Sequence, residues 1–195
     1  MDKARAKQML ETAREYVGDD VFKPKNFEDV DLRTFLRQYL WVIYVSGFRN
    51  AVVKKYFGGL QEGFHDLDLD RIVAMDGIDA RTLPIRNQRK ADAFLKGCRQ
   101  IHDEGWHAFK LRLGTRGRAA LRELPWMGPA TECHMALALG IEDIEKADTW
   151  IRQCAAKCSA TVDQMVTFLS SEYRLTRQRV DAYLWHYCSD NQRVP

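Results

Sequence analysis

The stretch that decides the fold is Leu124-Pro125-Trp126-Met127-Gly128-Pro129-Ala130-Thr131. It lies between a basic amphipathic segment and an alanine-rich segment that ends at Gly140. Gly128 permits close approach of the backbone to a ligand, and Pro129 suits the first position of a helix, where its missing N–H costs nothing. The stretch therefore predicts a helix, a tight turn and a second helix, whose free N–H groups would suit a phosphate. Taken alone, it is equally compatible with an ordinary helix connection.

Helical periodicity continues on both sides of this turn. Apolar residues recur at helical spacing over 36–44 and again over 91–101, whereas alternating strand patterns are scarce. Gly58-Gly59 is expected to end one helix, and a turn is expected near Gly114. We therefore predict an all-α fold of about ten helices with short connections. The longest irregular segments are expected near residues 18–27 and 78–84.

Composition places the chain among ordinary globular proteins. Of its 195 residues, 46% are hydrophobic and 29% are charged, and no stretch is apolar enough for a membrane span. The polar N-terminus leads into no apolar signal segment, so a cytosolic protein is the simplest inference. Five cysteines are an odd number, which favours reduced thiols over a disulfide framework.

Charge is distributed unevenly. Residues 61–80 carry six acids and one base, whereas residues 81–123 carry eleven bases and four acids, a local excess of seven positive charges. A basic stretch is more often a solvated helix face than a nucleic-acid site, so it becomes informative only beside a motif.

The continuation Lys146-Ala147-Asp148-Thr149-Trp150-Ile151-Arg152 supplies that motif, because Asp148 falls eighteen residues after Ala130. The pair of motifs resembles the helix-hairpin-helix GPD superfamily of DNA glycosylases, which includes endonuclease III and the alkylpurine glycosylases. The resemblance extends more loosely over about residues 36–188, including 85–90 and 180–185. It implies two helical lobes with DNA in the cleft: a central bundle from 42–140, and a second lobe from 1–41 together with 141–195.

The resemblance implies that Asp148 is the catalytic residue. A carboxylate beneath the deoxyribose stabilises the positive charge that develops when the glycosidic bond breaks, and it can orient or deprotonate water. Asp148 is also a good helix N-cap, and both roles can hold together. Bifunctional members place a Schiff-base lysine where this chain has Ala130, so the resemblance implies a monofunctional enzyme that uses water.

Base flipping needs a side chain that fills the gap in the duplex and a pocket that holds the base. Alignment with the family makes Phe48 the candidate wedge and Arg49 a candidate DNA contact, although an ordinary buried Phe is nearly as good an interpretation. The candidate base-pocket residues are Trp41, Tyr44 and Trp150, of which the first two suit core packing better. The remaining candidate DNA-binding residues are Leu124, Trp126, Gly128, Ala130, Thr131, Arg116 and Arg118.

The chain departs from the family at three points. Trp126 stands where the hairpin usually has its first Gly, and Trp150 replaces the common His after Asp-Thr. The iron–sulfur spacing Cys-x6-Cys-x2-Cys-x5-Cys of endonuclease III is absent, so we expect no cluster. We expect no cofactor and no side-chain metal site, and an alkali metal ion at the hairpin carbonyls would be compatible with the family.

The expected function is base excision repair by hydrolysis of a damaged or modified base from double-stranded DNA. Aromatic pocket candidates favour an alkylated purine slightly, and a specialised role such as phage defence is also compatible. We expect a monomer with no membrane contact, in the cytoplasm with the nucleoid or in the nucleus. The alternatives are a non-catalytic helix-hairpin-helix DNA-binding module and a helical protein-interaction domain.

Overall fold

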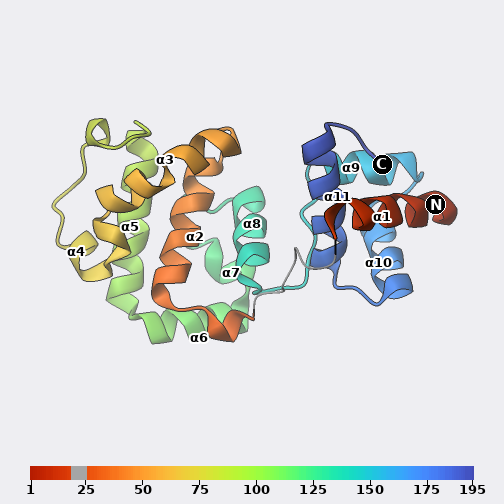
Figure 1. The fold of residues 1–195 in the computed structure, drawn as a ribbon. Helices are drawn as coiled ribbons and strands as arrows, with labels where there is room; N and C mark the ends of the chain where they lie inside the picture. Colours follow the sequence, from red (N-terminus) through yellow and green to blue (C-terminus); the bar gives the residue numbers. More distant parts are fainter. Residues whose placement is uncertain (19–25) are drawn as a thin grey trace. The chain divides into compact units, whose positions relative to one another are not determined.

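A computed structural model describes residues 1–18 and 26–195, and all regular structure in these ranges is helical (Figure 1). The predicted all-α class is confirmed at this level. Most of the irregular segment expected at 18–27 lies outside the described residues. None of the helices in the described ranges has the length and apolar character that a membrane span requires.

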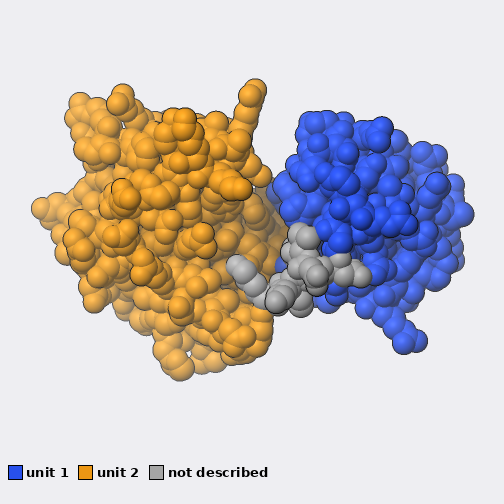
Figure 2. All heavy atoms as spheres, in the orientation of Figure 1, with its two compact units in different colours: residues 1–25, 143–195 blue, residues 26–142 orange. Residues whose placement is uncertain are grey.

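The chain forms two compact units, coloured separately in Figure 2: unit 2 is Asn26–Glu142, and unit 1 combines Met1–Lys25 with Asp143–Pro195. Unit 2 therefore begins before the helix Leu32–Val45, and not within it at residue 42 as the resemblance implied. The physical reason is that this helix contributes buried residues along its whole length, from Phe35 to Tyr44, to the core of unit 2.

Unit 2 is built around α2, which packs on α3, α5 and α8 (Figure 1). Ring contacts link the helices: Tyr39 lies 5.6 Å from Phe94, and Phe94 lies 4.7 Å from Phe64, between ring centroids. The helices of unit 2 are α2 (Leu32–Val45), α3 (Asn50–Gly63), α4 (Leu69–Val73), α5 (Gln88–Glu104), α6 (Trp106–Arg116), α7 (Arg118–Leu121) and α8 (Pro129–Leu139), with short 3-10 turns at Phe27–Asp29, His65–Leu67 and Ala80–Thr82.

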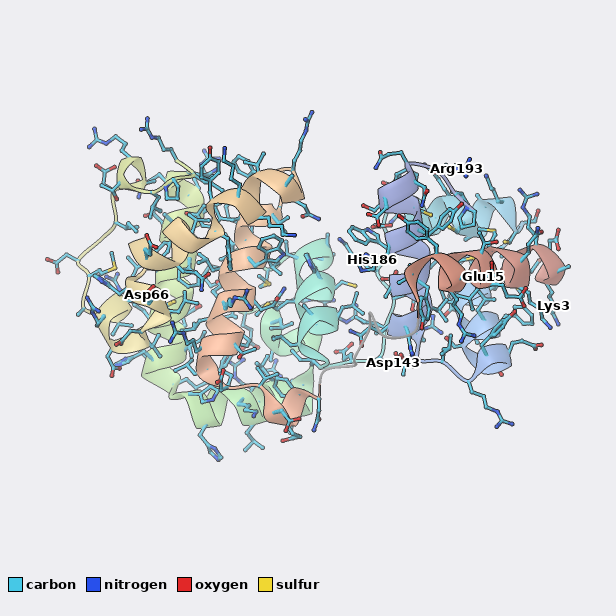
Figure 3. The ribbon with its side chains drawn as sticks, viewed as in Figure 1. Lys3, Glu15, Asp66, Asp143, His186 and Arg193 are labelled. Atoms are coloured by element: carbon cyan, nitrogen blue, oxygen red, sulfur yellow. The ribbon has the colours of Figure 1, made fainter. Side chains whose placement is uncertain are left out.

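Unit 1 joins the two ends of the chain in one core. Its helices are α1 (Lys3–Val17), α9 (Thr149–Lys157), α10 (Val162–Tyr173) and α11 (Arg177–Asn191), and α11 packs on the other three. The apolar face of α1 supplies Met9 and Leu10 to this core, and α11 supplies Val180 and Leu184. Asp143, labelled in Figure 3, accepts a hydrogen bond from the Gln178 N–H at the start of α11 (3.1 Å).

Side-chain caps explain where many helices begin. Asp2, Asp31, Asn87 and Thr176 each accept a hydrogen bond from a backbone N–H in the first turn of the following helix. Such caps satisfy donors that have no partner inside the helix. Local sequence thus fixes these starts without help from distant residues.

Two glycine-based boundaries differ from the prediction. The helix α3 continues through Gly58-Gly59 to Gly63. Two of its glycines serve close packing, since a Cβ on Gly59 would lie 3.1 Å from Pro84, and one on Gly63 would lie 2.3 Å from Leu83. Similarly, α6 continues through Gly114 and ends at Arg116, and it is followed by Gly117, which has a φ of +52°. Of Gly58, Gly59, Gly114 and Gly117, only Gly117 has the positive φ that favours glycine at a helix end.

Candidate functional site

The connection between α7 and α8, which corresponds to the predicted hairpin and is called the hairpin below, turns at Trp126 and not at Gly128. Trp126 has a φ of +69°, in the left-handed region, whereas Gly128 has a φ of −102°. A non-glycine residue in this region costs roughly 1–2 kcal/mol. The chain therefore keeps a tight turn at the position where Trp126 replaces the expected glycine, and the turn is strained there.

Thr131 closes the hairpin from the α8 side. Its Oγ1 accepts a hydrogen bond from the Gly128 N–H (2.8 Å) and lies 2.8 Å from the Trp126 carbonyl oxygen, to which it donates. The Gly128 N–H is therefore satisfied within the protein. The exposed Ala130 lies in the first turn of α8, where backbone N–H groups lack helical partners.

Two contacts hold the hairpin against the rest of unit 2. The Tyr39 hydroxyl donates a hydrogen bond to the Pro125 carbonyl oxygen (2.7 Å) from the buried side. Arg122 forms a two-pronged ion pair with the buried Glu132 of α8, in which Nη2 lies 2.6 Å from Oε1. The turn is thus fixed both from below and across its two arms.

Lys90 brings the hairpin and the α2–α3 turn together. Only 3% exposed, its ammonium donates hydrogen bonds to the carbonyl oxygens of Ile43, Tyr44 and Ser46, at the end of α2. The same Nζ lies 5.0 Å from the ring centroid of Trp126 and 5.2 Å from that of Phe48. We call these three residues the Phe48–Lys90–Trp126 cluster. Two turns that are far apart in the sequence thus share one cation.

The environment of Lys90 contains opposing effects. Burial lowers the pKa of the ammonium to about 8. The carbonyl oxygens and aromatic ring faces favour the charged form, because each directs negative charge at the ammonium. The sequence contained a sign of this group, since Lys90 lies four residues before Phe94 on the apolar stripe of α5. A lysine at such a position indicates a charged group that is buried with partners.

Phe48 and Trp126 expose their rings on the surface of unit 2. Phe48 is 37% exposed and Trp126 is 36% exposed, while the neighbouring Arg49 is exposed at the N-terminus of α3. The two predicted DNA contacts Phe48 and Trp126 therefore lie in one cluster. By contrast, Leu124 is buried beneath the turn, and Gly128 is half-buried.

Five of the eleven bases in residues 81–123 form ion pairs within the described part of the chain. Arg116 forms an ion pair with Glu123 (2.7 Å), and Arg118 contacts Glu142 through both its backbone N–H (2.7 Å) and its Nε (2.8 Å). These two predicted DNA contacts thus serve internal ion pairs in the structure. Arg86 and Arg89 are exposed and have no ion-pair partner among the described residues.

The three predicted base-pocket residues have three different environments. Tyr44 is fully buried in the core of unit 2, its hydroxyl has no hydrogen-bond partner in the described part of the chain, and burial raises its pKa. Trp41 is half-buried, with its ring 5.1 Å from that of Phe57. Trp150 packs against the core of unit 1. Tyr44 is therefore a core residue in this structure, as its spacing favoured.

Asp148 is the N-cap of α9 in unit 1. Its Oδ1 accepts hydrogen bonds from the backbone N–H groups of Trp150 (2.9 Å) and Ile151 (3.1 Å). The side chain is half-buried, and Oδ2 accepts no hydrogen bond from the described residues. The predicted cap is thus present, and one carboxylate oxygen stays available for another partner.

Asp181 is a second carboxyl group beside Asp148 that sequence reasoning missed. It is 8% exposed, lies on α11, and accepts a hydrogen bond from the Lys146 N–H (3.2 Å), two residues before Asp148. Burial, together with the negative charge of Asp148, raises the pKa of Asp181 to about 8. Its position between Val180 and Ala182, on a helix with many buried residues, was the available sign.

The cysteines are buried free thiols, and Cys154 and Cys188 lie 3.8 Å apart between sulfur atoms in the core of unit 1. Among residues 1–18 and 26–195, no group of three or more His, Cys, Asp or Glu side chains is arranged to hold a metal ion. No protein-family model, curated protein or solved structure matches the chain.

Proposed function

We propose that this chain is a monofunctional DNA glycosylase of the helix-hairpin-helix type, acting on double-stranded DNA in base excision repair. The observation that carries the proposal is the Phe48–Lys90–Trp126 cluster. It joins the predicted wedge turn and the predicted phosphate-binding hairpin on one surface of unit 2. Asp148 of unit 1 is the proposed catalytic carboxylate.

The exposed rings of the cluster suit contact with an opened duplex. Unstacking a base costs a few kcal/mol, which an inserted aromatic side chain offsets by stacking on the neighbouring bases. Arg49 and the backbone N–H groups at the start of α8 would contact phosphates. Because Arg116 and Arg118 are engaged in ion pairs, we assign more of the phosphate contact to the unpaired Arg86 and Arg89.

The proposed chemistry is hydrolysis of the N-glycosidic bond. The bond between C1′ and the base nitrogen breaks, and the base leaves with the electron pair. The oxygen of water bonds to C1′, and one water proton passes to the Asp148 carboxylate and then to the departing base. Ala130 offers no amine for a Schiff base, so the product is an abasic site without strand cleavage. An alkylated purine is slightly favoured as substrate.

Asp148→Asn separates catalysis from capping, because Asn caps helices as well as Asp does. The purified protein is incubated with duplexes that each carry one lesion, and abasic sites are scored as alkali-labile breaks. We expect Asp148→Asn to lose base release, to keep its duplex affinity, and to be at least as thermally stable as the unmodified chain. Asp190→Asn, an exposed acid of the same unit, is the matched control. An unchanged rate in Asp148→Asn would refute the catalytic assignment.

A DNA-binding module without catalysis is the alternative. It is supported by the fact that unit 2 carries every predicted site residue except Asp148 and Trp150. It predicts a duplex affinity that depends on salt, and no alkali-labile site with any lesion. Absence of salt-dependent affinity would refute both proposals and favour a protein-interaction domain. The proposal includes a monomeric protein in the cytoplasm with the nucleoid, or in the nucleus.

A further inference from the structure

A groove between α2 and α3 of unit 2 contains Trp41, a predicted base-pocket residue, but none of the DNA contacts on which the proposed function rests. Its volume is about 560 Å³, within the range of small-ligand sites. We call it the α2–α3 groove. It is lined by Arg37, Gln38, Trp41, Lys54, Phe57, Gly58 and Gln61.

Helical spacing places these residues on two facing surfaces. Arg37 and Trp41 lie one turn apart on α2, and Lys54, Gly58 and Gln61 follow one face of α3. Phe57 links the two helices, because its ring lies 5.1 Å from that of Trp41 and 5.9 Å from Cζ of Arg37. The groove therefore has an aromatic wall with a cation at its edge.

Gly58 keeps this groove open. A Cβ at this position would meet no atom within 4 Å, unlike the neighbouring Gly59, which lies against Pro84. Glycine in a helix interior is less favourable than alanine, so the local structure of α3 does not require it. Its absence of a side chain leaves space beside Lys54 and Gln61.

The charges of the groove are free for an anion. Neither Arg37 nor Lys54 forms an ion pair with any described residue, and no acidic side chain lines the groove. The amide groups of Gln38 and Gln61 both donate and accept hydrogen bonds, as the edge of a nucleobase does. Cations, an aromatic face and amides together match a planar base that is joined to a phosphate.

We propose that the α2–α3 groove binds a nucleotide, with its base against Trp41 and its phosphate between Arg37 and Lys54. Two sources carry this chemistry: a free nucleoside monophosphate and a nucleotide of a DNA strand. The groove is separate from the Phe48–Lys90–Trp126 cluster in its lining residues. The proposal therefore stands or falls independently of glycosylase activity.

Calorimetric titration of the full chain with dAMP, deoxyadenosine and inorganic phosphate tests the site. We expect dAMP to bind with a Kd of about 1 mM or tighter, and each fragment alone to bind about tenfold more weakly. A single-stranded tetranucleotide that binds about tenfold more tightly than dAMP identifies a strand as the source. Equal or weaker binding of the tetranucleotide identifies the free nucleotide.

Matched variants decide whether the binding occurs in the groove. Gly58→Leu fills the groove with a good helix former, so it should abolish dAMP binding without lowering the melting temperature. Lys54→Ala should weaken binding about tenfold, whereas Lys55→Ala should leave it unchanged, since Lys55 lies over Tyr56 and not in the groove. Undiminished dAMP binding by Gly58→Leu, or no dAMP binding by the unmodified chain, would overturn the proposal.

Discussion

Asp181→Asn should change how the stability of unit 1 depends on pH. The ordinary pKa of an aspartate is 3.8, and burial beside Asp148 raises that of Asp181 to about 8 in the folded chain. Between these two pH values the unfolded chain loses the proton, while the folded chain keeps it. Folding is therefore favoured at low pH, and the free energy of unfolding falls as pH rises, by up to about 1.4 kcal/mol per pH unit from this group.

The magnitude follows from the size of the shift. A change from 3.8 to about 8 sets an upper limit of roughly 6 kcal/mol, and relaxation of a buried site reduces it. Asparagine has the shape of the protonated acid, can still accept the Lys146 N–H, and never ionises. We therefore expect the stability advantage of Asp181→Asn over the unmodified chain to be small near pH 4, to grow as pH rises, and to reach at least about 2 kcal/mol at pH 8.

Urea unfolding at several pH values between 5 and 8, followed by circular dichroism, measures this difference. Asp148→Asn serves as a second probe, because removal of its charge should lower the pKa of Asp181 and flatten the pH dependence. A stability difference between Asp181→Asn and the unmodified chain that stays constant from pH 5 to 8 would refute the reasoning.

Three further predictions concern unit 2. Gly97→Ala should lower the free energy of unfolding by about 1–2 kcal/mol, since the new Cβ would lie 2.3 Å from the Tyr39 hydroxyl oxygen. Gly58→Ala should raise it, because the Cβ at that position meets no atom and alanine favours a helix. Thermal melting compares the two variants, and equal effects would contradict the packing argument. Lys90→Met should lower the free energy of unfolding, measured in urea, by about 3 kcal/mol, because three carbonyl oxygens lose a charged donor. A loss below about 1 kcal/mol would show that water replaces the ammonium group as the donor. Trp126→Gly should be more stable than Trp126→Ala by about 1 kcal/mol in urea unfolding. Both variants lose the tryptophan ring, but only glycine accepts the positive φ of this position without strain. The opposite order of stability would exclude a strained turn.

Local features of the fold could be predicted from the sequence. Apolar spacing identified α2 and α5, and the Gly128-Pro129 pair marked the start of α8. The role of Asp148 as a cap follows from its own neighbours in the chain. Each of these features depends on interactions within about one helical turn, which a sequence pattern records directly.

Features that depend on distant partners were not predictable in the same way. Gly58-Gly59 resembled a helix end, but Gly59 packs on Pro84, which is far along the chain. The basic segment was a candidate DNA-binding surface, but Arg118 in it pairs with Glu142, which is distant in the sequence. Lys90 also needed three-dimensional information, since its carbonyl partners lie 44 to 47 residues away.

The discontinuity of unit 1 has a consequence for biosynthesis. Unit 2 is continuous, so its whole core is available once residue 142 has left the ribosome, and domains generally fold as units during translation. By contrast, α1 is made before unit 2, but its apolar face packs on α11, which is made after unit 2. The nascent α1 must therefore wait, with Met9 and Leu10 lacking their α11 partners, until α11 has left the ribosome, and a chain truncated before α11 would leave part of that apolar face open to chaperones.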